Sequence, residues 1–407
     1  MGIAHELAVA FKRWRYVQRH GKAASPLSAT DFRAGAQPLI DAAAAHIAEA
    51  AFIDLPPSRM PWTSTDMVLA DGDEVTLLSV GRLWLSRGLD IWVGPQFQVW
   101  GRIGETGEVF NGTRETMTVT AQGTDATGGR LYLGGQFPGQ FSDRQGRMMP
   151  DLNAYAGADG DFTVLVIRWR KDAASGLAAM AAAGDVNGLV ALERDRLDNP
   201  DVPPEGWKPL WFLGQNKIYT EQSGTSGTSG ASDGTGVAGA AGGEGHACIH
   251  CHTDQNVGIL QKETPFALTP DTEISWDWKV DAIPSALPED TAASHDYISI
   301  AVEFENGRDI TYYWSRELPV GRAYWCPLPT WKDREFHVVI RSGEQDLKTW
   351  LSERRNLHAD YARYMGEPPQ RIVRVWFIAN SLFQRIPGTA DFRNITLANA
   401  GERLRVL

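Results

Sequence analysis

The 407-residue chain is poor in cysteine, in long apolar runs and in positive charge. Its 3 cysteines are too few for a disulfide framework and indicate a reducing compartment. It has no run of the ~18 apolar residues that a membrane-spanning helix needs. With 39 Lys and Arg against 50 Asp and Glu, the net charge is −11, whereas nucleic acids and anionic membranes require a cationic surface. The sequence therefore predicts a cytoplasmic protein that binds neither nucleic acid nor membrane.

The remaining composition is that of an ordinary globular protein with many aromatic residues. Hydrophobic residues make up 43% of the chain and charged residues 22%, which is enough for a sizeable core. The 15 tryptophans favour strands and ligand-binding surfaces. At ~100–200 residues per domain, the length allows two or three domains. The first residues carry their charges after a short apolar run, which predicts an amphipathic helix and not a secretory signal.

Changes in sequence pattern divide the chain into five predicted segments. Ile40, Ala44, Ile47 and Ala51 stand at helical spacing, whereas short β-branched and aromatic runs separated by Gly-rich turns predict sandwiches. The fold class is thus mainly β, with two jelly-roll or β-sandwich domains. In order, the segments are an N-terminal helical segment (1–60), a first sandwich (61–171), a helical connector (172–222), a flexible Gly/Ser-rich loop (223–245) and a second sandwich (246–407) with one inserted helix (347–364).

The start of the second sandwich, G-H-A-C-I-H-C-H-T-D, holds the densest group of reactive side chains. His246, Cys248, His250, His252 and Asp254 occupy every second position. In a strand, side chains alternate with a period of two, so all five would share one face. We expect that face to line a cleft in the second sandwich, covered by the Gly-rich loop.

The same letters also spell the C-x-x-C-H pattern of c-type haem attachment, through Cys248, Cys251 and His252. This interpretation predicts a covalent haem with His252 as axial ligand. Three observations weigh against it: no export signal is evident, strand-like sequence follows the motif, and no plausible distal Met lies nearby.

A transition-metal site is a second interpretation of the segment. His250 and His252 form an H-x-H pair that would bind zinc or iron from one strand face, with a third ligand from His295 or His337. Cys326 is a further option, although a buried thiol is more often inert.

A metal-free acid/base pair is the third interpretation. Imidazole titrates near neutral pH, so His252 with Asp254, and His295 with Asp296, would suit proton transfer. Tyr312 would supply a hydroxyl donor. The alternative is that these histidines are ordinary hydrogen-bonded residues at a strand end.

Two parts of the chain resemble known families. The motifs G-D-E-V-T-L-L-S-V-G-R-L-W, G-R-I-G and G-D-F-T-V in the first half resemble the bacterial calcium-dependent galactose-binding lectins, which implies a jelly roll and a carbohydrate ligand. Gln136 stands where that resemblance would place an Asp ligand, and calcium prefers charged oxygens, so a scaffold without the family's ligand is expected. The C-terminal motifs H-D-Y-I-S-I-A-V-E-F, T-Y-Y-W-S and F-R-N-I-T-L resemble an uncharacterised bacterial β-sandwich family, which implies no activity.

The leading prediction is an enzyme of lyase or hydrolase type that acts on a small organic substrate by His/Asp proton transfer, with or without a metal. The predicted catalytic residues are His252, Asp254, His295, Asp296 and Tyr312; the predicted metal ligands are His250, His252 and His295. Two alternatives stay open: a carbohydrate-binding protein and a c-type haem protein.

Overall fold

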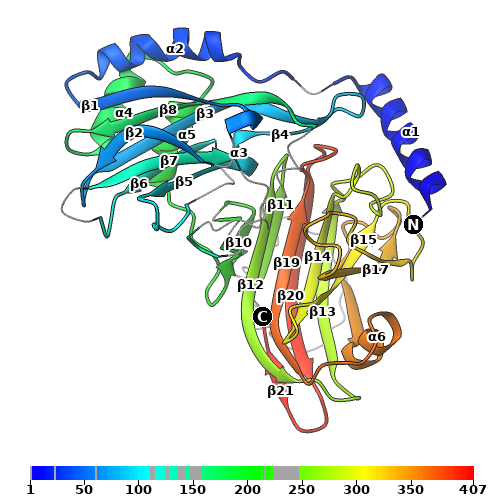
Figure 1. The fold of residues 1–407 in the computed structure, drawn as a ribbon. Helices are drawn as coiled ribbons and strands as arrows, with labels where there is room; N and C mark the ends of the chain where they lie inside the picture. Colours follow the sequence, from blue (N-terminus) through cyan, green and yellow to red (C-terminus); the bar gives the residue numbers. More distant parts are fainter. Residues whose placement is uncertain are drawn as a thin grey trace, which may run out of the picture.

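The computed structural model describes residues 2–22, 24–59, 62–110, 115–124, 128–135, 143–145, 157–211, 213–214, 216–222 and 247–407. The chain is mainly β, as predicted, and forms two sandwiches with helices at its start and between them (Figure 1). The predicted loop over 223–245, together with His246 and Gln136, lies outside the described residues.

The first sandwich consists of a five-stranded and a three-stranded antiparallel sheet. Aliphatic side chains such as Leu77 and Leu133 fill the space between the sheets, because alternate residues of each strand face inward. The larger sheet contains β1 (Ile47–Leu55), β8 (Asp159–Trp169), β3 (Glu74–Ser86), β4 (Ile91–Val93) and β6 (Thr116–Thr120); the smaller contains β2 (Thr63–Leu69), β7 (Gly129–Gly135) and β5 (Val99–Ile103).

Three helices cover the outer face of the larger sheet (Figure 1). Phe32 and Leu177 on these helices pack against Leu78 and Leu165 of the sheet, which forms a second core. The covering helices are α2 (Ala29–Ala42), α4 (Ala173–Ala183) and α5 (Leu189–Asp198); the short η1 (Pro57–Arg59) and α3 (Pro95–Gln98) lie in connections.

The predicted helical segment over 1–60 is only partly correct. α2 ends at Ala42, and β1 then pairs with β8 along its length, from Ile47 opposite Trp169 to Leu55 opposite Phe162. The helical spacing of Ile47 and Ala51 is therefore coincidental. Pairing with an already buried strand outweighs the weak helix preference of an Ala-rich segment.

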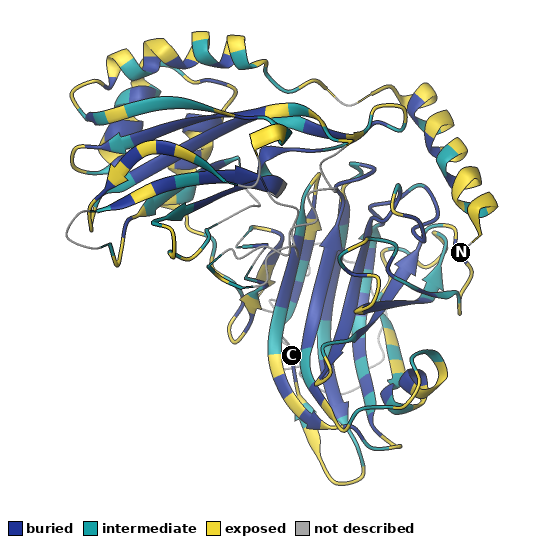
Figure 2. Cartoon of the chain, in the orientation of Figure 1, coloured by how far each residue is buried: buried dark blue, intermediate teal, exposed yellow. Residues whose placement is uncertain are grey.

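The second sandwich packs a six-stranded sheet against a seven-stranded sheet around the largest core of the molecule (Figure 2). Among the described strand pairs of this sandwich, β15 and β17 are parallel and the others are antiparallel. The six-stranded sheet contains β10 (Tyr219–Gln222), β11 (Cys248–Thr253), β20 (Gly388–Ala398), β13 (Glu273–Ala282), β18 (Leu351–Asn356) and β21 (Arg403–Arg405); the seven-stranded sheet contains β16 (Ala323–Trp325), β17 (Glu335–Ser342), β15 (Asp309–Ser315), β14 (Tyr297–Phe304), β19 (Arg371–Asn380), β12 (Val257–Ala267) and β9 (Lys208–Pro209).

The predicted helix over 347–364 is also only partly correct. Its first half is the strand β18, which pairs with β13, and α6 (Leu357–Tyr364) begins only after Asn356. The Asn356 side chain accepts a hydrogen bond from the Ala359 N–H and thereby caps the helix. Arg354 and Arg355 thus belong to a strand.

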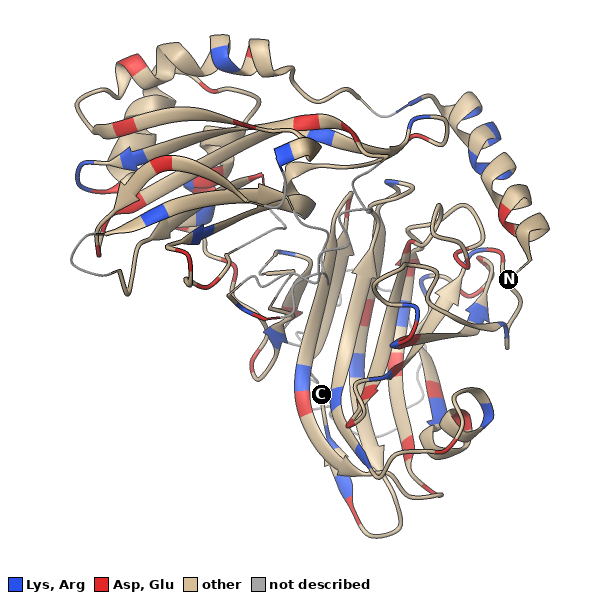
Figure 3. Ribbon diagram, in the orientation of Figure 1, with Lys and Arg blue, Asp and Glu red and all other residues tan. Residues whose placement is uncertain are grey.

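The N-terminal helix α1 (Ile3–His20) lies beside the second sandwich, and its Lys and Arg residues lie in its C-terminal half (Figure 3). Its inner face is marked by the buried Val9, Arg13 and Val17. Arg13 donates hydrogen bonds to the carbonyls of Leu89 in the first sandwich and Phe383 in the second. Within the described part of the chain, no helix combines the length and apolarity needed to cross a membrane.

Candidate functional site

The segment 248–253 is the strand β11, and its alternation places two sets of side chains on opposite faces. Ile249 and Cys251 join the core between the sheets. Cys248, His250 and His252 share the other face, which points outward. The predicted strand and shared face are thus present, but this face does not line the interior of the sandwich.

His250 lies in a small network of charged groups on this outer face. Its Nδ1 lies 2.6 Å from Asp391 Oδ1, and Lys279 Nζ lies 2.8 Å from Asp391 Oδ2. Burial opposes ionisation of Asp391, yet the hydrogen bonds from His250 and Lys279 hold its pKa below the usual value. His252 is exposed, and the hydrogen bond observed for its side chain within the described structure is to the Thr389 hydroxyl, at 3.2 Å.

This network predicts a pH-dependent contribution to stability. A carboxylate with a lowered folded-state pKa stabilises the protein above its unfolded pKa of ~3.9, and this is lost as the pH falls through the folded pKa. We expect Lys279→Met to lower the free energy of unfolding by ~1 kcal/mol at pH 7 and by much less near pH ~3. Urea unfolding at both pH values measures this, with His252→Ala as the neutral control. An equal loss at both pH values would contradict the prediction.

The strand geometry does not fit the haem interpretation. Thioether attachment requires both cysteines to reach the same porphyrin, but Cys248 and Cys251 point to opposite faces of β11. Cys251 has no solvent exposure and lies between the two sheets. Burial also raises the pKa of Cys248 to about 11, so its thiol is protonated at neutral pH.

The predicted metal ligands are likewise separated by the fold. His250 and His252 lie on the outer face of the six-stranded sheet. His295 packs against Tyr297 and Tyr324 on the outer face of the seven-stranded sheet. The whole thickness of the sandwich, with packed sheets ~10 Å apart, stands between them. These three histidines therefore do not meet at one ion.

The other predicted catalytic residues occupy three different surroundings. Asp296, next to His295, is fully buried and accepts hydrogen bonds from the Phe383 and Gln384 N–H groups. Burial raises its pKa to about 7, although those two bonds oppose the shift. Tyr312 lies in the core between the sheets and donates to Asp360. The predicted constellation of two His/Asp pairs and a tyrosine is not assembled.

The predicted residue Asp254 instead lines a cleft of about 370 Å³ between the two sandwiches. Three regions form its walls: the first sandwich, the connector and the turn between β11 and β12. Its polar and aromatic lining residues include Ser79, Trp92, Gln96, Glu115, Asn187, Asn216, Asp254, Gln255 and Asn256.

The turn that carries Asp254 is held in place by its own side chains. Asn256 Oδ1 accepts hydrogen bonds from the Thr253 hydroxyl at 2.6 Å and from the Asp254 N–H at 3.2 Å. The Ser381 hydroxyl bonds to Thr253 Oγ1 at 2.8 Å and accepts from the Asn256 N–H. Gln255 adopts a left-handed backbone with φ of 53°. The turn is thus preorganised, and Asp254 and Gln255 remain exposed at its tip.

Several polar side chains that line the cleft make no hydrogen bond to another residue of the described structure. Trp92 Nε1 is buried without a hydrogen-bond partner among the described residues. In the same part of the chain, no hydrogen bond is observed for the side chains of Gln96 and Asn187. Burial raises the pKa of Glu115. Sequence patterns did not indicate these residues, because they come from separate turns and strand ends.

A family model matches residues 239–396, and its description is "Protein of unknown function (DUF3047)". The predicted resemblance of the C-terminal part to an uncharacterised family is thereby confirmed. No curated protein matches the chain.

Solved structures similar to the chain include lectins and carbohydrate-binding modules. The EclA N-terminal domain, a PllA-like lectin, is 17% identical, with 30% of this chain and 98% of that chain covered and a TM-score of 0.21. TmCBM61 in complex with β-1,4-galactotriose is 8% identical, with 48% and 90% covered and a TM-score of 0.24. The family 11 carbohydrate-binding module of Lic26A-Cel5E from Clostridium thermocellum is 13% identical, with 50% and 92% covered and a TM-score of 0.24. At these TM-scores the likenesses do not bear on the function of the chain.

Proposed function

We propose that the cleft between the sandwiches binds a neutral carbohydrate. The observation that carries this proposal is the set of polar side chains on its walls: the Trp92 indole N–H, which is buried without a partner among the described residues, the Gln96 and Asn187 amides and the Glu115 carboxyl. Sugar hydroxyls both donate and accept hydrogen bonds, so amides, carboxylates and an indole N–H suit them.

The size and charge of the cleft support the same class of ligand. A volume of about 370 Å³ lies in the range of small-molecule sites. Among the described residues that line it there is no Lys, Arg or His, whereas Glu115 and Asp254 are present. Two carboxyl groups without a lining cation disfavour a phosphorylated or carboxylated ligand. Arg82 and Arg385 lie over the Trp92 ring, at 5.5 and 4.6 Å from its centroid, so Trp92 contributes its N–H more than a stacking face.

The proposal replaces proton-transfer chemistry as the leading function. Asp254 stays in the site as a hydrogen-bond acceptor, whereas His252 is exposed beside Thr389 and the pair His295 and Asp296 is buried. The positions of these four residues do not support a shared acid/base mechanism.

Binding of soluble sugars tests the proposal. Titration calorimetry with galactose, glucose and their β-1,4-linked disaccharides should give saturable binding for at least one sugar, with Kd in the ~0.1–10 mM range. Gln96→Ala and Asp254→Ala should each weaken binding by ~5–10-fold, because each removes one hydrogen-bonding group. Both residues are partly or fully exposed, so folding should be unaffected.

Matched controls separate a specific loss from a general one. Gln345→Ala and Asp333→Ala remove an exposed amide and an exposed carboxylate outside the cleft and should leave binding unchanged. Spermidine tests the competing ligand class, a polyamine drawn by Glu115 and Asp254. Spermidine binding without sugar binding, or equal losses in cleft and control variants, would overturn the proposal.

A further inference from the structure

Four side chains with metal-ligating atoms meet on the outer face of the seven-stranded sheet of the second sandwich. They are His295, Cys326, Glu335 and His337, and all four are buried. Their ligand atoms all lie within 4.8 Å of one another. This cluster is separate from the carbohydrate cleft, because none of the four lines it.

Strand register explains why residues distant in sequence meet here. Glu335 and His337 are two apart on β17, so they share a face. β16 pairs with β17, with Tyr324 opposite His337, and Cys326 follows directly after this strand. His295 precedes β14 and packs edge-on against His337, with ring centroids 4.7 Å apart. Two adjacent strands and one loop therefore supply all four groups.

The hydrogen bonds direct the His295 ring toward the centre of the cluster. Its Nδ1 lies 2.6 Å from the Glu289 carbonyl oxygen, which can only accept, so Nδ1 carries the hydrogen. Nε2 then presents its lone pair, and Cys326 Sγ lies 3.4 Å from it. A histidine bound through one nitrogen to a metal and through the other to a carbonyl is the usual arrangement.

His337 supplies the second, independent observation. Both of its ring nitrogens are buried and have no hydrogen-bond partner in the described structure. Nε2 lies 3.4 Å from Glu335 Oε2. The other oxygen, Oε1, accepts from the Tyr297 hydroxyl at 2.8 Å, which orients the carboxylate. A buried imidazole whose nitrogens make no hydrogen bond carries a desolvation cost that a bound cation would remove.

We propose that His295, Cys326, Glu335 and His337 bind one zinc ion in a closed, structural site. Tetrahedral zinc, with N and O ligands at ~2.0–2.1 Å and sulfur at ~2.3 Å, places ligand atoms ~3.3–3.6 Å apart. The two observed separations of 3.4 Å fall in this range. A thiolate and a carboxylate balance the ion's double charge. Four protein ligands fill the coordination sphere, so the ion's role is to hold the fold together.

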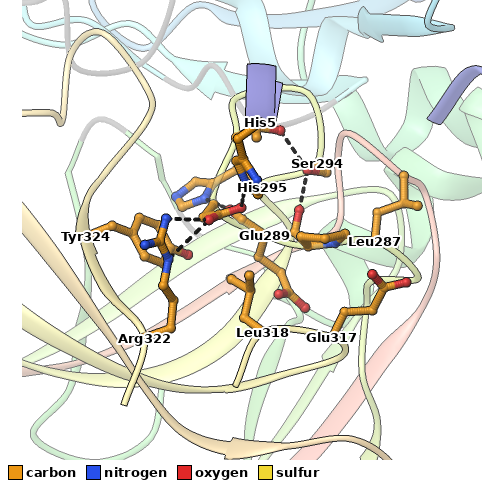
Figure 4. Close-up of polar contacts among 12 residues, drawn as sticks. His5, Leu287, Glu289, Ser294, His295, Glu317, Leu318, Arg322 and Tyr324 are labelled. Atoms are coloured by element: carbon orange, nitrogen blue, oxygen red, sulfur yellow. Dashed lines mark hydrogen bonds and ion pairs between the residues drawn. The ribbon is translucent and has the colours of Figure 1, made fainter. Parts of the chain in front are cut away.

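The loop over 283–296, which carries His295, is held in position by the protein itself (Figure 4). Buried Asp290 in this loop bonds to His5 of α1 at 2.8 Å and to Arg322 at 2.8 Å. Asn380 donates to the His295 carbonyl at 2.8 Å. The ligands are thus preorganised, and the ion would fasten this loop and the end of β16 to the sheet.

The test uses the full chain purified without a metal-affinity tag. Elemental analysis should find one zinc per chain, and removal by a chelator should lower Tm by roughly 4–8 °C, restored by added zinc. Cobalt substitution of the parent protein should give a thiolate-to-cobalt charge-transfer band and intense tetrahedral d–d bands. Cys326→Ser should abolish the charge-transfer band, and His337→Gln should lower the zinc content.

Two controls and the parent's own spectrum keep the test decisive. Cys251→Ser changes a buried thiol outside the cluster, and His250→Ala removes the H-x-H pair on β11; both should keep one zinc. If Cys326→Ser fails to fold, the cobalt spectrum of the parent shows directly whether a thiolate is bound. No zinc in the parent with Tm insensitive to added zinc, or zinc lost in His250→Ala but kept in Cys326→Ser, would overturn the proposal. Sugar binding is measured separately, and its outcome does not decide the zinc proposal.

Discussion

Replacing Arg13 by alanine is expected to lower the free energy of unfolding by ~3–5 kcal/mol, because this side chain joins both sandwiches. Arg13 is 1% exposed. Its Nε donates to the Leu89 carbonyl at 2.9 Å, and its Nη2 donates to the carbonyls of Asp90, at 3.2 Å, and Phe383. Burial lowers the pKa of Arg13 to about 10, against the opposing charge of Asp296, so the guanidinium is still charged at neutral pH.

The expected loss comes from the Leu89 and Phe383 carbonyls, which no longer have their Arg13 donor, whereas the Asp90 carbonyl still accepts from Arg385. Arg13→Lys should recover little of it, since one ammonium group does not match three carbonyls presented to a planar fork. Urea unfolding measures the change, and Arg15→Ala, on the exposed side of α1, is the matched control with an expected effect within ~0.5 kcal/mol. A loss below ~1 kcal/mol for Arg13→Ala would show that α1 contributes little to the junction.

The sequence predicted the strands well where their side chains alternate. β14, for example, begins and ends at Tyr297 and Phe304, as its β-branched and aromatic pattern indicated. The errors fall where helix-forming residues build a strand. The Arg- and Glu-containing β18 has good helix propensity, but its partner β13 satisfies its backbone from Glu273 to Trp278. Propensity is a weak prior against such pairing.

For the candidate sites, the sequence predicted which residues share a strand face but not which face points into the sandwich. Alternation correctly placed His250 and His252 on one face of β11, but the inward face was set by Ile249 and Cys251, whose apolar side chains belong to the core. The prediction that the polar face of β11 lines the interior rested on its charge and hydrogen-bonding capacity, and it was wrong. A polar strand face is more often the solvent face, and this rule would have given the correct orientation.

The buried cluster was indicated only in fragments. The sequence predicts His295, His337 and Cys326 as separate candidate ligands, and it does not indicate Glu335, although E-F-H in a strand places Glu335 on the face of His337. The parallel pairing of β15 and β17 and the course of the loop before β14 bring these residues together. Such long-range register is not contained in any local pattern. The cleft depends in the same way on how the two sandwiches meet.

Replacing Asp360 by alanine is expected to lower the free energy of unfolding by ~3 kcal/mol, because it leaves the buried Tyr312 hydroxyl and the half-buried Arg355 guanidinium without their acceptor. Asp360 on α6 accepts from Arg355 Nη2 at 2.6 Å and from the Tyr312 hydroxyl at 2.7 Å. The bonds to Asp360 raise the pKa of Arg355, although burial opposes them. The carboxylate therefore connects α6, β18 and the core between the sheets, and Tyr312 has a structural role here.

Removing only the Tyr312 hydroxyl gives a smaller change with which the loss in Asp360→Ala can be compared. Tyr312→Phe keeps the ring in the core and the pair between Arg355 and Asp360, so we expect a loss of only ~1 kcal/mol. Glu273→Ala breaks the exposed pair with Arg354 on the same strand pair and should change stability by less than ~0.5 kcal/mol. Chemical unfolding of the three variants at neutral pH measures this order. If Tyr312→Phe were as destabilising as Asp360→Ala, the ion pair would add nothing beyond the hydroxyl contact, which would mean that water solvates the half-buried Arg355 charge well enough.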